Sequence, residues 1–392
     1  MRNCELNFKL EDVLPKFKPG LQKKILHSVD LIRKAEKLAL AYDPENGYFS
    51  TFSGGKDSQC LYHIVKMAGV KHKTHMNLTS IDPPEVIRFV RTEYPDVEMA
   101  KPKDSIFHIA IKKKILPTRR VRWCCAEYKE MAGAGKVTLI GIRHAESSRR
   151  AKRNEVEVSN GEYSGDLAGL DEYRKQRNSK HTARKGTFSI INVNGERELG
   201  CIHGKESLLI SPIIEWTDDD VWTFLNTLGI KHCCLYDEGV KRIGCILCPM
   251  SQPAQKKNEI KRWPHVKRNW INAIKIIRRG GQFNRGEFKD YIWWNIPKDF
   301  TPLPRRGWRL RLDGKCQAAA KTTDAEKPDE EELMRNADVQ SKDVSCASYE
   351  KLTEDQENEI AENIFDWWIS GESYKKWYFE KFMQQDMFKK KD

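Results

Sequence analysis

The chain has 392 residues, of which 39% are hydrophobic and 10% aromatic, enough to build one large folded domain with appendages. No apolar run approaches the ~20 residues that cross a bilayer, and the first residues, Met1–Glu5, are polar. These features exclude a disordered or membrane-spanning chain and predict a cytoplasmic protein without a membrane partner, of unknown oligomeric state. The formal net charge of +13 favours anionic partners, such as nucleotides or nucleic acid.

Predicted helices and strands alternate along the first half of the chain. Residues 1–45 are predicted to be helical, because their apolar side chains recur at three- and four-residue steps. The predicted strands cover residues 48–52, 73–78, 97–100 and 137–140, and the predicted helices between them cover residues 58–67, 84–94 and 105–115. This alternation indicates an α/β fold, a doubly wound parallel sheet with helices on both faces.

The remaining sequence is predicted to complete this domain and to add a helical C-terminal extension. A strand over residues 208–214 precedes a helix opened by Thr217, with three aspartates, Asp218–Asp220, in its first turn. The predicted parts are an N-terminal helical segment (1–45), a nucleotide-binding domain (46–254) with an insertion or flap (151–205), a helical extension (255–312), a linker (313–348) and a helical hairpin (349–392).

The segment Ser53-Gly54-Gly55-Lys56-Asp57-Ser58 joins the first predicted strand to the next helix. Its glycines let backbone amides approach phosphate oxygens, and the start of a helix adds unpaired N–H donors. The serines supply hydroxyl groups, Lys56 a cation, and Asp57 a carboxylate that can hold Mg²⁺ or orient a leaving group. The segment differs from both the Walker-type and the dinucleotide-binding glycine patterns, and it predicts phosphate binding. Thr79–Asp82 and Gly141–Glu146 also follow predicted strands, where ligands bind in such sheets.

Three cysteine pairs indicate a metal centre. Cys245 and Cys248 form a Cys-x-x-Cys motif, and Cys124-Cys125 and Cys233-Cys234 are adjacent pairs. Four thiolates can hold either a [4Fe–4S] cluster or a zinc ion. One possible ligand set combines Cys124 and Cys125 with Cys245 and Cys248, and 119 residues separate Cys125 from Cys245. A local alternative includes Cys234, which ten residues separate from Cys245. The candidate ligands are therefore Cys124, Cys125, Cys234, Cys245 and Cys248.

These motifs resemble those of the phosphoadenosine-phosphosulfate (PAPS) reductase family in the PP-loop superfamily. Beside the glycine loop, the resemblance rests on blocks that together span about residues 47–250: Arg122-Trp123-Cys124-Cys125 with Lys129, Gly141-Ile142-Arg143 with Glu146-Ser147 and Arg149, and Ser211-Pro212-Ile213-Ile214 with Trp216-Thr217 and Val221-Trp222. It implies that the loop holds the pyrophosphate or sulfo-phosphate of ATP or a PAPS-like nucleotide. It also implies that Thr79, Ser80 and Asp82 lie near the nucleoside, and that Gly141, Arg143 and Arg149 lie at the anionic end. Adenylyl-sulfate reductases of this family carry a [4Fe–4S] cluster on a similar cysteine pattern, which favours that cluster over zinc.

The expected reaction is adenylation. Family reductases attack sulfur with the cysteine of a Glu-Cys-Gly motif, which this sequence does not contain. We therefore predict attack of an acceptor on the α-phosphorus of ATP with release of pyrophosphate, assisted by Lys56, Asp57, Arg143 and Mg²⁺. The activated oxygen would then suit displacement by sulfur from a donor protein. The alternatives are reduction of PAPS or adenylyl sulfate, and a nucleic-acid-binding role in DNA or RNA modification, which the basic clusters over residues 112–122 and 143–153 suggest.

Overall fold

The computed structural model describes residues 2–130, 132–159, 161–182, 189–191, 197–202, 205–278, 308–310, 316–318 and 353–372. The chain divides into two compact units, both discontinuous in sequence. The first comprises Met1–Ser105 and Arg122–Cys248, and the second comprises Ile106–Val121 and Pro249–Asp392. Most of the predicted linker over residues 313–348, and the second half of the predicted hairpin over residues 373–392, lie outside the described residues.

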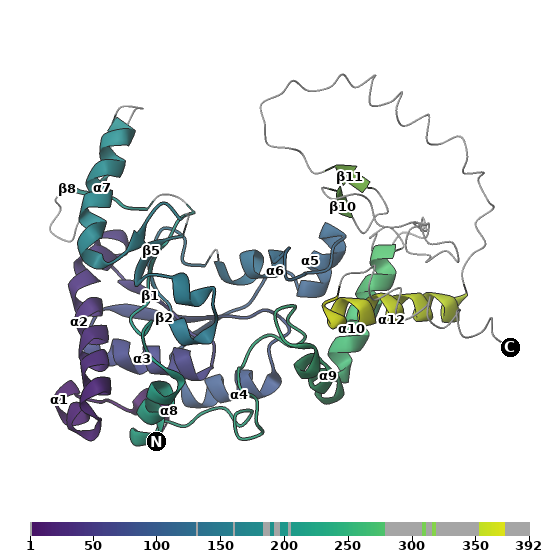
Figure 1. The fold of residues 1–392 in the computed structure, drawn as a ribbon, viewed down its shortest axis with the longest axis horizontal. Coiled ribbons are helices and arrows are strands. Elements are labelled where there is room, and N and C mark those ends of the chain that lie inside the picture. The colour runs from purple at the N-terminus through teal and green to yellow at the C-terminus, as the bar shows by residue number, and fades with distance from the viewer. Residues whose placement is uncertain are drawn as a thin grey trace. The chain divides into compact units, whose positions relative to one another are not determined.

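A seven-stranded sheet forms the centre of the first unit (Figure 1), in the order β3-β2-β1-β4-β9-β5-β6. The strands are β1 (Tyr48–Thr51), β2 (His72–Asn77), β3 (Glu98–Ala100), β4 (Val137–Leu139), β5 (Val156–Val158), β6 (Ser164–Gly165) and β9 (Leu208–Ile210). The run from β3 to β9 is parallel, whereas β5 and β6 are each antiparallel to their neighbours. The predicted α/β architecture is confirmed, with an antiparallel extension at one edge.

That antiparallel edge comes from residues 151–205, where the sequence predicts an insertion or flap. Strands of two or three residues are too short to show an alternating pattern, so the sequence gives no sign of them. The same stretch also holds α7 (Leu167–Thr182) and a separate hairpin of β7 (Ser189–Ile191) and β8 (Arg197–Leu199). Strand β9 ends four residues before its predicted end, at Ile210. Pro212 follows, and its missing N–H prevents the strand from continuing as a ladder.

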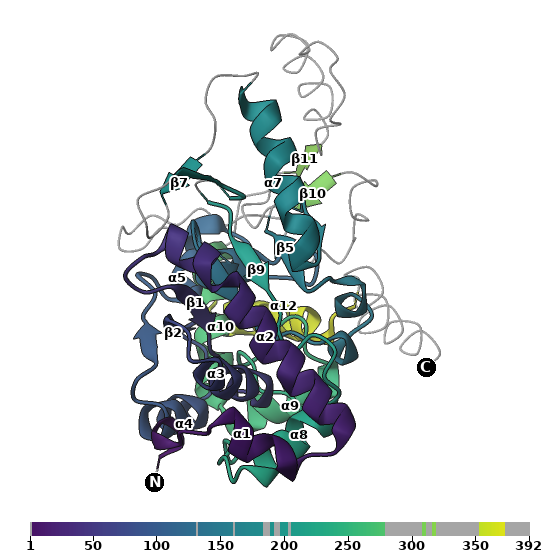
Figure 2. The same ribbon diagram turned by 90° about the vertical axis from the view of Figure 1, so that its left-hand side faces the viewer.

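Helices cover both sides of this sheet, and the long helix α2 (Pro19–Tyr42) crosses in front of it (Figure 2). The apolar positions predicted to form a stripe on this segment, from Leu21 to Leu38, are buried. The other helices and turns of the unit are η1 (Asn3–Glu5), α1 (Leu10–Val13), η2 (Leu14–Lys16), α3 (Lys56–Ala68), α4 (Pro84–Glu93), α6 (Trp123–Cys125), η3 (Ala126–Glu130), η4 (His144–Glu146), η5 (Arg150–Lys152) and α8 (Asp218–Thr227).

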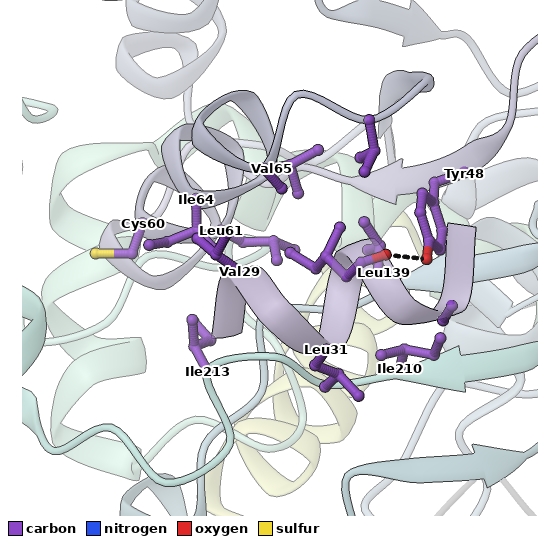
Figure 3. Close-up of a cluster of buried hydrophobic side chains, with 14 of the residues drawn as sticks. Val29, Leu31, Tyr48, Cys60, Leu61, Ile64, Val65, Leu139, Ile210 and Ile213 are labelled. Atoms are coloured by element: carbon purple, nitrogen blue, oxygen red, sulfur yellow. Dashed lines mark hydrogen bonds between the residues drawn. The ribbon is translucent and has the colours of Figure 1, made fainter. Parts of the chain in front are cut away.

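The hydrophobic core fixes the strand and the helix that flank the glycine loop. Val29 of α2 and Leu61 of α3 are buried together with Leu139 of β4 (Figure 3). Each fully buried side chain of this size contributes about 1.5–3 kcal/mol. The Tyr48 hydroxyl of β1 donates to the carbonyl oxygen of Ile32, 2.6 Å away. Among the described residues, no helix is both long enough and apolar enough to cross a membrane.

The second unit is built on helices and confirms a helical C-terminal extension, which the structure describes up to Arg278. Residues 279–307 of the predicted extension lie outside the described residues, and residues 308–310 form a strand rather than a helix. It contains α5 (Ile106–Lys113), α9 (Pro253–Arg262), α10 (Pro264–Arg278), α12 (Glu354–Ser370), and a hairpin of β10 (Trp308–Leu310) and β11 (Cys316–Ala318). Aromatic rings join three of these helices, because Trp270 of α10 lies 4.9 Å from both Phe107 and Trp368. The Trp368 indole N–H donates to the carbonyl of Pro117 at 2.6 Å. Helix α5 therefore packs with α10, although its sequence lies between β3 and β4.

Candidate nucleotide-binding site

The site lies where the strand order of the sheet reverses. Strands β1 and β4 are parallel neighbours, and the chain leads away from them toward opposite edges of the sheet. Such a reversal leaves a crevice beyond the carboxyl ends of the strands. The glycine loop follows β1, and Gly141 follows β4. A Cβ on Gly141 would lie 3.2 Å from the carbonyl oxygen of Asp57, so a glycine here lets the end of β4 approach the first turn of α3.

The two glycines of the loop differ in conformation. Gly54 has a φ of +72°, in the left-handed region, whereas Gly55 is extended and forms the N-cap of α3. A Cβ on Gly54 would also lie 2.7 Å from Cγ1 of Val86 and 3.0 Å from Cγ2 of Val90, both on α4. Position 54 therefore requires glycine for its backbone angle and for its close contact with α4.

Backbone amides are the main unused donors of the loop. The N–H groups of Gly54, Gly55, Asp57 and Ser58 have no hydrogen-bond acceptor within the described part of the chain. Those of Asp57 and Ser58 belong to the first turn of α3, where intrahelical acceptors are lacking. The hydroxyls, in contrast, bond within the loop: Ser58 Oγ accepts from the Ser53 N–H at 3.2 Å and donates to the Gly55 carbonyl at 2.8 Å. The loop thus presents several amides to an anion.

Two cations and two carboxylates alternate beside these amides. The Lys56 ammonium lies 3.1 Å from the Asp218 carboxylate and 3.3 Å from that of Asp57. The Arg143 guanidinium donates to Asp57 at 2.7 Å, to Asp218, and to the carbonyl of Trp216 at 3.1 Å. Arg143 is only 1% exposed. Burial opposes its charge, but the two carboxylates outweigh that effect and raise the pKa of Arg143. The three predicted catalytic residues are therefore brought together.

Asp218 is the member of this charged group that sequence reasoning missed. The three aspartates of α8 are predicted only as favourable charges in a first turn. Asp220 does act in this way, since its N–H donates to Thr217 Oγ1 at 3.1 Å while its carboxylate accepts from the Thr217 N–H at 2.8 Å. Asp218 instead reaches Lys56 and Arg143, and these contacts lower its pKa against the effect of burial. One aspartate is enough to complete the helix cap, so the presence of three in the sequence was the sign that another of them has a different role.

The segment predicted to lie near the nucleoside forms a closed turn. The N–H and the hydroxyl of Thr79 both donate to the Asp82 carboxylate, at 2.6 and 2.9 Å. Ser80, between them, has a φ of +65°. The carbonyl of Ile81 accepts from the N–H of Ile246 at 2.8 Å. The turn after β2 is therefore bonded directly to the Cys-x-x-Cys loop.

The basic cluster after β4 is partly neutralised within the unit. Arg150 pairs with Glu146, and Arg153 pairs with Glu157. Glu146 also accepts from the backbone N–H of Arg143 at 3.0 Å. Arg149 is exposed, and no acidic partner contacts it within the described ranges. The charge available to an external anion is thus smaller than the number of arginines suggests.

Four of the predicted metal-binding cysteines influence one another electrostatically. Arg122 donates to Cys125 Sγ at 3.2 Å, and Lys129 donates to Cys245 Sγ at 3.3 Å. The hydrogen bond with Cys124, followed by the contact with Arg122, lowers the pKa of Cys125 to about 5. The Cys125 thiol and burial, with smaller effects of Cys248 and Cys245, raise the pKa of Cys124. The fifth candidate, Cys234, is exposed and is not among the groups that act on Cys124.

These thiols match the donor chemistry of an iron–sulfur or zinc centre without forming a closed ligand shell. No three His, Cys, Asp or Glu side chains are gathered to hold one ion in the part of the chain that the structure describes. Cationic N–H groups beside two of the sulfurs are nevertheless the surroundings that stabilise thiolate ligands. By donor chemistry, the residues present fit such a centre.

A recess of about 640 Å³ lies away from the loop, lined by residues that include His27, His144, Arg153, Tyr163 and Glu215. His144 follows Arg143 in sequence, but Arg143 itself is buried among its carboxylate partners. None of the glycine-loop residues lines this recess. The candidate nucleotide site is therefore placed at the loop rather than at this recess.

The sheet of this α/β domain carries unpaired amides at its strand-order reversal, beside a lysine and an arginine that both pair with carboxylates. This is the local geometry expected of an anion-binding loop. Residues 47–251, just over half of the chain, match the family model described as the phosphoadenosine phosphosulfate reductase domain. The chain belongs to this family of PP-loop enzymes. The family resemblance seen in the sequence is thereby confirmed.

Individual relatives are distant. An uncharacterized protein of Methanocaldococcus jannaschii is 24% identical over 278 residues, covering 69% of this chain and 58% of that protein. A probable FAD synthase of Schizosaccharomyces pombe is 24% identical over 243 residues, covering 60% of this chain and 72% of that protein. The crystal structure of Candida glabrata FMN adenylyltransferase with FMN and an ATP analogue has a TM-score of 0.35 at 12% identity, covering 60% of this chain and 68% of that one. The chain spans about half the length of the first curated relatives it matches.

Proposed function

We propose that this protein binds ATP at its glycine loop and transfers the adenylyl group to an acceptor, releasing pyrophosphate. The observation that carries the proposal is the row of amides at Gly54, Gly55, Asp57 and Ser58, which have no acceptor among the described residues and lie beside Lys56. This is an arrangement for a polyphosphate. The name of the Schizosaccharomyces pombe relative, a probable FAD synthase, supports a nucleotide substrate.

In the proposed reaction, an acceptor oxygen attacks the α-phosphorus of ATP. A bond forms between that oxygen and phosphorus, and the bond from phosphorus to the bridging oxygen breaks. The electron pair leaves with pyrophosphate, and the acceptor releases its proton to solvent. The loop amides and Lys56 stabilise the charge that moves onto the leaving group. Mg²⁺ would enter with the triphosphate, and Asp57 and Asp218 offer carboxylates of the kind it prefers.

Arg143 acts on the nucleotide indirectly in this proposal. Because it is 1% exposed and bonded to Asp57, it holds that carboxylate in place rather than facing the phosphates. Exposed Arg149 is the better candidate for direct contact with the anionic end. Gly141 serves as the point of close approach between β4 and α3, while Thr79, Ser80 and Asp82 are proposed to lie near the nucleoside.

We further propose that Cys124, Cys125, Cys245 and Cys248 hold a [4Fe–4S] cluster. When bound, such a cluster supplies iron–sulfur chemistry, which suits sulfur delivered by a donor protein. Arg122 favours the thiolate form of Cys125, and Lys129 donates a hydrogen bond to Cys245 Sγ. The four proposed ligands are free thiols, which suits the reducing cytoplasm.

The products of ATP turnover test the proposal. With ATP and Mg²⁺ alone, water takes the place of the acceptor, and the protein should form AMP and pyrophosphate, measured by chromatography and a pyrophosphate assay. Lys56→Ala should lower the rate about 100-fold, the scale for removing one preorganised charge-stabilising group. Lys24→Ala is the matched control, because Lys24 also pairs with an aspartate of α8, Asp220, at 2.6 Å.

The control variant should retain the wild-type rate. Formation of ADP and phosphate, or an unchanged rate in Lys56→Ala, would contradict adenylyl transfer. Release of sulfite from PAPS or adenylyl sulfate, with ATP left intact, would instead identify a sulfonucleotide reductase, the alternative that the family description favours.

A further inference from the structure

A tyrosine hydroxyl from a distant part of the chain lies at the glycine loop. The backbone N–H of Lys56 donates to Tyr236 Oη at 2.9 Å, across 180 residues of sequence. A Cβ on Gly55 would lie 3.4 Å from both Tyr236 Oη and Ser53 Oγ. The two hydroxyls therefore flank the same point of the loop. Tyr236 lies between Cys234 and Cys245 and belongs to none of the predicted motifs.

The ring of Tyr236 is held independently of its hydroxyl. It packs edge-on against Trp222 of α8, with ring centroids 5.1 Å apart, and His232 lies 6.0 Å away. Its backbone N–H donates to the carbonyl of Cys233 at 3.0 Å. A phenylalanine at this position keeps these ring and backbone contacts and loses only the hydroxyl.

The Tyr236 hydroxyl accepts a hydrogen bond from one amide of the loop and can donate a hydrogen bond of its own. Lys56 provides the first amide of α3, and this amide already donates to Tyr236, whereas the next two lack acceptors within the described residues. A phenol that accepts one hydrogen bond still has its own proton to donate. No acceptor for that proton is found in the described part of the chain.

We infer that Tyr236 is a phosphate-binding residue of the nucleotide site, whose hydroxyl extends the amide row of the loop and donates to a phosphate oxygen. This inference rests on the proposed function. The competing view is that the hydroxyl only blocks the Lys56 amide and must leave when a phosphate arrives. The two views predict opposite changes in phosphate affinity when the Tyr236 hydroxyl is removed.

The test is the affinity of Tyr236→Phe for ATP, pyrophosphate and adenosine, measured by isothermal titration calorimetry on the full chain. A hydrogen bond to a charged group is worth about 1.5–3 kcal/mol, so ATP and pyrophosphate should bind at least about tenfold more weakly. Adenosine, which has no phosphate, should bind as it does to the wild type. Tyr163→Phe is the matched control, because its hydroxyl donates to the Asp166 carbonyl instead.

Each outcome decides a separate question. Unchanged or tighter binding of ATP to Tyr236→Phe overturns the inference, and tighter binding identifies the hydroxyl as a block. An equal loss for adenosine also overturns it, because the effect would not be specific to phosphate. A wild-type protein that binds neither ATP nor pyrophosphate overturns the proposed function itself.

Discussion

Gly54 and Gly55 stand side by side, yet only Gly54 combines a φ of +72° with a position where an added Cβ would strike α4. Gly55 has an ordinary extended backbone as the N-cap of α3. The first glycine therefore shapes the loop, whereas an added Cβ on the second would make only ordinary contacts with two hydroxyl oxygens, at 3.4 Å. The requirement for glycine is thus set by backbone angle and packing at position 54.

Gly54→Ala should weaken both folding and ATP binding. The left-handed backbone costs a non-glycine residue about 1–2 kcal/mol, and the contact with Val86 and Val90 adds to that cost. Chemical denaturation measures the stability change, and calorimetry should show ATP affinity reduced at least about tenfold. Gly229→Ala is the control, because Gly229 has a φ of +63° but nothing within 4 Å of an added Cβ. Equal stability loss and normal ATP binding in both variants would refute this account.

At the residue scale, sequence patterns are most informative where the residues are adjacent. Ser53–Ser58 was recognisable because six adjacent residues form the loop, and the structure places Arg143 with Lys56 and Asp57 in one charged group. Asp218 and Tyr236 reach the same loop from more than 160 residues away. No spacing rule links such distant positions, so only the folded chain reveals them.

At the scale of elements, the N-cap of α8 connects stability to the site. Thr217→Ala removes a capping hydroxyl worth about 1 kcal/mol, which should lower the melting temperature by about 2–4 °C. Because the next residue is Asp218, the loss should also disturb the contacts with Lys56 and Arg143 and slow pyrophosphate release. Thr353→Ala removes the equivalent cap of α12, in the second unit, and should cost similar stability without slowing the reaction. Equal rates in the two variants would argue against this link.

The elements themselves were predictable to the extent that they are long. The regular spacing of apolar residues predicts helix α2 and the alternation of strands and helices from β1 to β4, because each of these segments buries one face. Strands β5 and β6 have three and two residues and left no pattern. The early end of β9 follows from Pro212, a single residue that outweighs an otherwise favourable strand sequence.

At the scale of the whole molecule, the cysteines of α6 and of the Cys-x-x-Cys loop should act as one centre. Anaerobically purified protein should contain iron and acid-labile sulfide, measured by metal analysis and visible absorption. Cys245→Ser should lose most of the iron, whereas Cys234→Ser should retain it, because Cys234 is exposed and lies outside the proposed set of four ligands. Stoichiometric zinc without iron would contradict the cluster, and loss of iron in Cys234→Ser would support the local ligand set.

The discontinuity of the two units has a consequence for how the protein is made. Ile106, Ala110 and Ile111 of α5 are buried in the second unit, whose next segment begins at Pro249. At 5–20 residues per second, this apolar face leaves the ribosome on the order of 10 s before its partners. It must stay uncovered for that interval, as a target for chaperones. A chain ending at Cys248 would expose it permanently, so the first unit is better isolated by replacing residues 106–121 with a short polar linker.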